Sequence, residues 1–248
     1  MLSTARLTRE PLVEIAGSFM TSPELAAREE AAGLPPRTLY FRGRTAVLGN
    51  PSPGVVASVL GIFPEWLVEK ALVRAFPADR AIEAYLGGCW DWSRNHLAGT
   101  PEPARFAELA FAVVDGAEAS ALPLFRGWRE AARPDDGPAA LGHALMVLRE
   151  LRGGLHFAAL RAVGLDVTQA VALDPGGGRG RLLRTGWRPE DAEALLASVA
   201  DRPDLAARWR RAEQLTDDRF DDALAVLSDA ERAEFADRLL APVTPTRG

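Results

Sequence analysis

This chain of 248 residues has few of the side chains that most often carry chemistry. Its one cysteine, Cys89, excludes a disulfide within the chain and a zinc site built from several cysteines. It has three histidines, His96, His143 and His156, and no two of them have the spacing of a His-x-x-x-His metal pair. A cofactor fingerprint is also missing, so we predict neither a metal site nor a cofactor.

Long apolar runs are missing as well. Runs such as residues 54–63 (GVVASVLGIF) fall well short of the roughly 20 apolar residues that a transmembrane helix needs. The N-terminus lacks a basic region followed by an apolar stretch, which a secretory signal would have. We therefore expect a soluble, cytoplasmic protein with no membrane partner.

Lysine is nearly absent, because Lys70 is the only lysine among 29 basic residues. The formal net charge is −5, which argues against a protein that coats nucleic acid but is compatible with a local basic patch. Hydrophobic residues make up 48% of the chain, which is enough to bury a core.

Helical periodicity dominates the sequence and predicts an all-α, multi-helix fold. Residues 38–49 (TLYFRGRTAVLG) are an exception, because their aromatic and β-branched residues, between Pro35-Pro36 and Asn50-Pro51, predict a loop or a short β ribbon. Ser22-Pro23, Ser52-Pro53 and Ser228 with Glu231 are typical helix starts. The expected helices are 8–18, 22–32, 53–61, 64–75, 78–97, 103–115, 117–131, 138–163, 167–173, 189–199, 203–227 and 229–240.

The cluster PDDGP at residues 134–138 is the best linker candidate. It would separate an N-terminal helical half, residues 1–133, from a C-terminal half, residues 138–243. The alternative is a turn within one compact domain. The C-terminal helices also make a homo-oligomer compatible with the sequence.

The helix expected at residues 138–163 carries charge where apolar residues would pack more simply. On a helical wheel, Arg149, Arg152 and His156 fall together, so that their heads can converge on one anionic group. A second stripe holds His143, Glu150 and Arg161. The apolar seam opposite the first stripe consists of Ala144, Val147, Leu148, Leu151, Leu155 and Ala158.

Gly153 and Gly154 lie in the middle of this helix, where each glycine costs roughly 0.5–1 kcal/mol. Such a pair indicates close approach of another backbone or a ligand, or a break between two helices. The plain alternative is that the charged residues form a solvated face. If the face is buried, each guanidinium must have a partner, and a bound anion would be one.

Five runs of the sequence resemble a known family. The most specific element combines His143 and His156 with the run Leu148-Arg149-Glu150 and the pair Arg152-Gly153. The runs are LYFRGRTAVLG (39–49), SVLGIFPEWLV (58–68), CWDWSRNHL (89–97), LGHALMVLRELRGGLHFAALRAVGL (141–165) and RWRRAEQLTDDRF (208–220).

Over roughly residues 10–240, these runs are similar to a family of actinobacterial helical proteins described as helix-turn-helix-like. The resemblance implies a soluble helical fold with degenerate winged-helix features, similar to MarR-type regulators toward the C-terminus, and it implies no particular reaction. Many relatives have His where this chain has Leu151 and Asp where it has Gly154. A mechanism of those relatives that needs a third imidazole at position 151 or a carboxylate at position 154 therefore cannot apply to this chain.

We expect first a helical protein that binds a small anionic or carbonyl-bearing organic molecule, in actinobacterial specialised metabolism or its regulation. Arginine suits bidentate recognition of a carboxylate or phosphate, and tyrosine adds an apolar wall with a hydroxyl. The candidate ligand-binding residues are Tyr40, Arg42, Arg44, Arg149, Glu150, Arg152 and His156.

The first alternative is an enzyme without a cofactor. His143 and His156 would do acid–base work, and Arg149 or Arg152 would stabilise a developing oxyanion. The two imidazoles point about 140° apart on a continuous helix, at about 100° per residue. They can share a site only if the glycine pair bends the chain.

The second alternative is a DNA-binding regulator of winged-helix type. Residues 159–173 resemble a helix, a glycine turn and a second helix, and residues 174–188 resemble a basic wing. Residues 213–237 weigh against it, because they hold nine acidic residues against two arginines. The arginines of the expected wing are Arg179, Arg181, Arg184 and Arg188.

Overall fold

A computed structural model describes residues 3–241, and within that range the chain forms helices and no strand. The all-α prediction is confirmed. The α-helices are α1 (Thr4–Ser18), α2 (Pro23–Ala31), α3 (Pro53–Leu60), α4 (Glu65–Ala71), α5 (Ala78–His96), α6 (Pro103–Gly116), α7 (Pro123–Arg129), α8 (Gly137–Ala162), α9 (Val167–Leu173), α10 (Gly178–Arg184), α11 (Pro189–Val199), α12 (Pro203–Leu224) and α13 (Asp229–Leu240).

The predicted helix starts form as expected. The Ser22 side chain accepts a hydrogen bond from the backbone of Leu25, and Pro23 occupies the first turn of α2. Ser228 and Glu231 form a reciprocal capping box at the start of α13. Some boundaries are wrong. The helix predicted at residues 117–131 begins only at residue 123, after a turn, the one predicted from residue 8 begins at residue 4, and the one predicted to end at residue 75 ends at residue 71.

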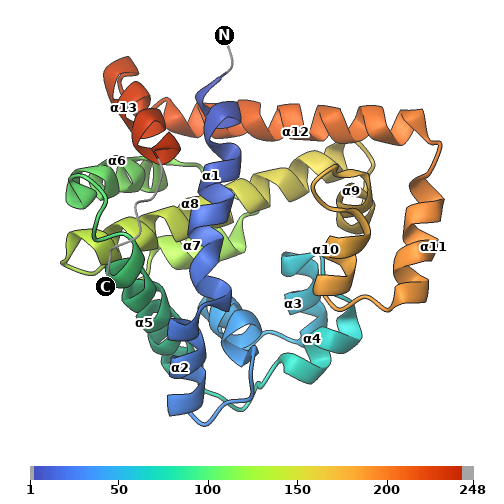
Figure 1. Cartoon of the computed structure of the whole chain (residues 1–248), viewed down its shortest axis with the longest axis horizontal. Helices are drawn as coiled ribbons and strands as arrows, with labels where there is room; N and C mark the ends of the chain where they lie inside the picture. The colour runs from blue at the N-terminus through green and yellow to red at the C-terminus, as the bar shows by residue number, and fades with distance from the viewer. Residues whose placement is uncertain (1–2, 242–248) are drawn as a thin grey trace.

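Helix α8 runs through the middle of the molecule, with α1 crossing it and α5, α6, α7 and α12 packed around it (Figure 1). Ala144, Val147 and Leu148 of its apolar seam are fully buried, whereas Ala158 near its C-terminal end is exposed. The main core takes residues from both sides of residues 134–138. The division into two halves stays a prediction, and its last residues, 242–243, lie outside the described range.

The segment at residues 38–49 is helical, so the expected loop or ribbon is wrong. It contains a π turn, η2 (Leu39–Gly43), and a 3-10 turn, η3 (Ala46–Leu48). Tertiary packing overrides the local preference, because Leu39 and Phe41 are fully buried. Gly43 allows close packing, since a Cβ there would lie 2.9 Å from Cδ2 of Tyr85. Single π turns of this kind are frequent at functional sites.

Helices α9, α10 and α11 contact one another and form a three-helix unit, which lies beside one end of α8 (Figure 1). Its small core includes Val171, Leu182 and Ala192. The expected wing at residues 174–188 is therefore wrong, since its middle part, Gly178–Arg184, forms α10. Leu182 of this helix is completely buried against Val171 and Ala192, and this packing stabilises the helix after the glycine run.

Within residues 3–241, no helix combines the length and hydropathy that crossing a bilayer requires.

Candidate functional site

Two groups of buried and partly buried charged side chains lie along the C-terminal half of α8. The first, here called the arginine cluster, consists of Tyr40, Arg44, Tyr85, Arg149 and Glu150. The second, here called the balanced cluster, consists of Arg9, Arg152, His156, Glu213 and Asp217.

A bidentate ion pair forms the base of the arginine cluster. Arg44 follows the π turn, and its Nε and Nη2 donate to Oε1 and Oε2 of Glu150 at 2.7 and 2.9 Å. Burial opposes ionisation of both groups, but their attraction wins: the pKa of Glu150 is lowered and that of Arg44 is raised. This pair is neutral as a unit.

Arg149 brings a second guanidinium to the same carboxylate. Its Nη1 lies 3.5 Å from Oε1 of Glu150, and its Nε is buried with no hydrogen-bond partner among the described residues. A Cβ at Gly17 of α1 would lie 3.4 Å from this Nε, so the glycine leaves room for it. Burial, and then the charge of Arg44, lower the pKa of Arg149. The cluster therefore holds two guanidiniums against one carboxylate, an excess of one positive charge.

Two tyrosines complete the arginine cluster, and the chain has no others. The Tyr40 ring centre lies 5.9 Å from the guanidinium carbon of Arg44. The Tyr85 hydroxyl is buried and has no hydrogen-bond partner among the described residues. Burial raises the pKa of Tyr85 well above its usual value, with smaller effects from Arg44, Glu150 and Arg149 around it. Tyr85 is thus a neutral donor next to the excess positive charge.

The balanced cluster has as many carboxylates as guanidiniums. Arg152 Nη2 lies 3.3 Å from Asp217 and 3.6 Å from Glu213. Arg9 Nη1 lies 3.4 Å from Glu213 and 3.8 Å from Asp217. The pKa of Asp217 is raised because burial outweighs its arginine neighbours. These four charges cancel, so this cluster has no excess charge to attract a ligand.

His156 lies at the edge of the balanced cluster. The Thr216 hydroxyl donates to the Ala212 carbonyl oxygen at 2.7 Å, so His156 Nδ1 donates to that hydroxyl at 3.1 Å. Burial, and then the charge of Arg152, lower the pKa of His156 to about 4. The imidazole is therefore neutral near pH 7.

His143 lies in a separate, apolar environment. It is buried, with Trp90 and Phe111 rings beside it, and burial lowers its pKa to about 4. Since α8 is one continuous helix, thirteen residues put His143 and His156 about 20 Å apart along its axis. The structure does not bring the two candidate catalytic histidines together.

Arg42 also lies outside both clusters. Its Nε donates to the Phe76 carbonyl oxygen at 2.9 Å, and its Nη1 donates to the Gly49 carbonyl oxygen at 2.8 Å. Burial, and then Arg74, lower its pKa. Arg42 therefore holds the turns around residues 49 and 76 in place. Of the candidate ligand-binding residues, Tyr40, Arg44, Arg149 and Glu150 come together, and Arg152 with His156 form part of the neighbouring cluster.

The glycine pair does not break α8. A Cβ at Gly154 would lie 2.6 Å from Cδ2 of Leu122, so this glycine allows a close approach of the turn before α7. A Cβ at Gly153 would meet no atom within 4 Å. Gly153 lies four residues after Arg149 and three before His156, so this local space lies on the helix face between the two clusters.

Sequence reasoning missed four members of these clusters. Tyr85 could have been noticed, because it is one of only two tyrosines. Glu213 and Asp217 are four residues apart and share a face of α12, but nothing in the sequence directs that face toward α8. Arg9 carries no distinguishing pattern. In the described part of the chain, no group of three or more His, Cys, Asp or Glu side chains is arranged to hold a metal ion.

Three arginines of the expected wing, Arg179, Arg181 and Arg184, lie on α10, and Arg188 is the N-cap of α11. Arg181 pairs with Asp174 at 3.3 Å and Arg179 pairs with Glu193. Arg179, Arg184 and Arg188 are exposed. The exposed residues of α11, the third helix of the unit, are Pro189, Glu190, Asp191, Glu193, Ala194, Ala197 and Ser198.

The sequence matches a family described as a helix-turn-helix family over residues 5–246. No curated protein and no solved structure gives a significant match.

Proposed function

The chain belongs to the helix-turn-helix family, and we propose that it is a member that binds a small organic monocarboxylate at the arginine cluster. One observation carries the proposal: Arg149 brings a second, largely buried guanidinium to a carboxylate that Arg44 already neutralises. A buried charge without a partner is costly, and an anion supplies the missing partner.

The hydrogen-bond donors of the cluster support the same ligand. Arg149 Nε and the Tyr85 hydroxyl are buried donors without acceptors among the described residues. A carboxylate has two acceptor oxygens, and it can accept two parallel hydrogen bonds from the N–H groups along one edge of a guanidinium. The excess charge is one unit, which a monocarboxylate balances and a phosphate dianion would exceed. The Arg149 side chain is 20% exposed, so a ligand can reach it from solvent.

Calorimetric titration with acetate, pyruvate, benzoate and inorganic phosphate tests the proposal. We expect a carboxylate to bind the wild type, and Arg149→Met to weaken that binding at least about tenfold, or about 1.4 kcal/mol. Arg161→Met is the matched control, because Arg161 lies on the same helix, is 71% exposed and pairs with Asp166.

Two results would contradict the carboxylate site. One is equal binding to the wild type and to Arg149→Met. The other is a preference for phosphate over every carboxylate, because it conflicts with an excess of one charge.

We propose DNA binding by the α9–α11 unit as the second candidate, and family membership is the observation that favours it. Residues 159–212 hold nine arginines and seven carboxylates, a local charge of +2 in a chain of net charge −5. Helix α11 presents carboxylates and no exposed arginine, so base readout by this helix is disfavoured. Contact through phosphates, by the exposed Arg184 and Arg188, is the form that these charges support.

A further inference from the structure

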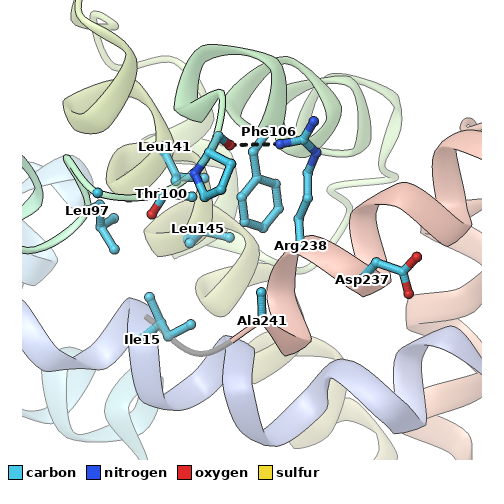
Figure 2. Close-up of a pocket in the computed structure, with 11 residues that line it drawn as sticks. Ile15, Leu97, Thr100, Phe106, Leu141, Leu145, Asp237, Arg238 and Ala241 are labelled. Atoms are coloured by element: carbon cyan, nitrogen blue, oxygen red, sulfur yellow. Dashed lines mark hydrogen bonds between the residues drawn. The ribbon is translucent and has the colours of Figure 1, made fainter. Parts of the chain in front are cut away.

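An apolar cavity of about 240 Å³ lies beside the N-terminal half of α8, away from both charge clusters. Ile15 of α1 and Ala241 at the end of α13 lie on one side of it (Figure 2). Phe106 of α6 with Leu141 and Leu145 of α8 lie on the other side (Figure 2). The remaining lining residues are Leu97, Gly99, Thr100, Pro101, Asp237 and Arg238.

The cavity wall formed by Leu97 and Gly99 to Pro101 is held in place by Arg238. This guanidinium donates Nη1 to the Pro101 carbonyl oxygen, Nη2 to Glu102 and Nε to Glu234, each at 2.8 Å (Figure 2 shows the first). Glu102 adopts a left-handed backbone conformation with φ of 45°. A non-glycine residue keeps such a conformation only where the surroundings fix it. The cavity is thus bounded by a fixed turn.

The charges at the cavity exclude an ionic ligand. Arg238 pairs with the carboxylates of Glu102 and Glu234, so its charge is already balanced and does not attract an anionic ligand to the cavity. Asp237 points away from the cavity (Figure 2). The inner walls are the side chains of Phe106, Leu141 and Leu145, which are almost completely buried.

We infer that this cavity is a second small-molecule site, which takes a neutral aromatic compound of one or two rings. An apolar cavity of about 150 Å³ stays dry and holds benzene, so one of about 240 Å³ has room for a fused bicyclic ring. A buried Phe106 ring on one wall favours an aromatic guest through edge or offset stacking. This site does not depend on the arginine cluster.

Indole serves as the probe, because it is neutral, bicyclic and soluble. We expect saturation-transfer NMR and calorimetry on the full chain to detect indole binding. Ile15→Phe should weaken it at least about tenfold by filling the cavity. Val13→Phe is the matched control, since Val13 is an exposed position on the same helix and does not line the cavity. Arg149→Met should bind indole as the wild type does.

A second variant covers the case in which Ile15→Phe does not fold. Ala241 is exposed and lines the cavity, so Ala241→Phe narrows it without disturbing the core. Circular dichroism verifies the fold of each variant. Absence of indole binding to the wild type would overturn the inference. Equal binding to the wild type and to a folded cavity-filling variant would also overturn it.

Discussion

Arg44 and Glu150, 106 residues apart in the sequence, meet in a buried pair with two hydrogen bonds. This pair uses both carboxylate oxygens of Glu150. The neighbouring guanidinium of Arg149 therefore has no carboxylate of its own. The proposed carboxylate site depends on this arrangement, in which the single carboxylate of Glu150 faces the guanidiniums of both Arg44 and Arg149.

We expect Glu150→Gln to destabilise the protein by about 3–5 kcal/mol, because it leaves two buried guanidiniums without an anion. Urea unfolding measures the loss. Glu83→Gln is the control, since Glu83 is 73% exposed and its removal should change the free energy of unfolding by less than about 0.5 kcal/mol. If the two variants were equally stable, the charge balance of the arginine cluster would be wrong.

Replacing Arg44 and replacing Arg149 should change the free energy of unfolding in opposite directions. Arg44→Met leaves Glu150 with only the longer contact to Arg149, and we expect a loss of about 3 kcal/mol. Arg149→Met removes the unbalanced charge, and we expect ligand-free protein to gain about 1 kcal/mol. Thermal and urea unfolding without added carboxylate test both, with Arg161→Met as the unaffected control. A loss of stability in Arg149→Met would mean that Arg149 is structural.

Much of the fold follows from the sequence because helical periodicity is local. The buried seam of α8 and the capping residues of α2 and α13 depend on neighbours three or four positions away. The partners of the charged residues on α8, in contrast, come from distant parts of the sequence. Arg44 reaches Glu150 only because a π turn, hidden among aromatic and β-branched residues, replaces the expected loop.

In the C-terminal half, local composition led to a wrong prediction. The glycine run at residues 176–178 predicts an irregular wing, but the few residues after it form a helix. Burial of Leu182 against Val171 and Ala192 decides that outcome, and none of these contacts is visible from local composition. Pairing of Arg152 with Asp217 is equally hidden, because 65 residues separate them.

Acid should destabilise the protein through His143 and His156, whose pKa values are lowered in the folded state. Both His143 and His156 have folded pKa values of about 4, below the usual 6.5. Between these values the unfolded chain binds more protons, so stability falls as the pH decreases from 6.5 to 4. From pH 7 to 5, we expect each histidine to account for a loss of roughly 1–2 kcal/mol.

Urea unfolding at pH 7 and pH 5 measures how much of this loss of stability the two histidines cause, when both are replaced. The double variant of His143→Leu and His156→Gln should lose less stability between the two pH values than the wild type. His96→Gln is the control, since the His96 side chain is 48% exposed. An unchanged pH dependence in the double variant would show that other groups cause the acid sensitivity.

Binding of duplex DNA by the α9–α11 unit should be weak and dominated by phosphates. We expect a mobility shift at about 50 mM salt that disappears by about 200 mM. Replacing Arg184 and Arg188 together with alanine should reduce binding on every sequence and lower the salt slope by about two, one for each lost phosphate contact. Arg219→Ala is the control, because Arg219 is exposed on α12 and pairs with Asp222.

Replacing acidic residues of α11 should strengthen DNA binding, whereas replacing the arginines weakens it. Replacing Glu190 and Asp191 with alanine removes two carboxylates from the start of the helix that would face the groove, so DNA binding should become several-fold tighter. Weaker binding in that variant would mean that α11 reads bases through these carboxylates, which accept hydrogen bonds from cytosine. No shift by the wild type at low salt would end the DNA hypothesis, because attraction to phosphates is strongest there.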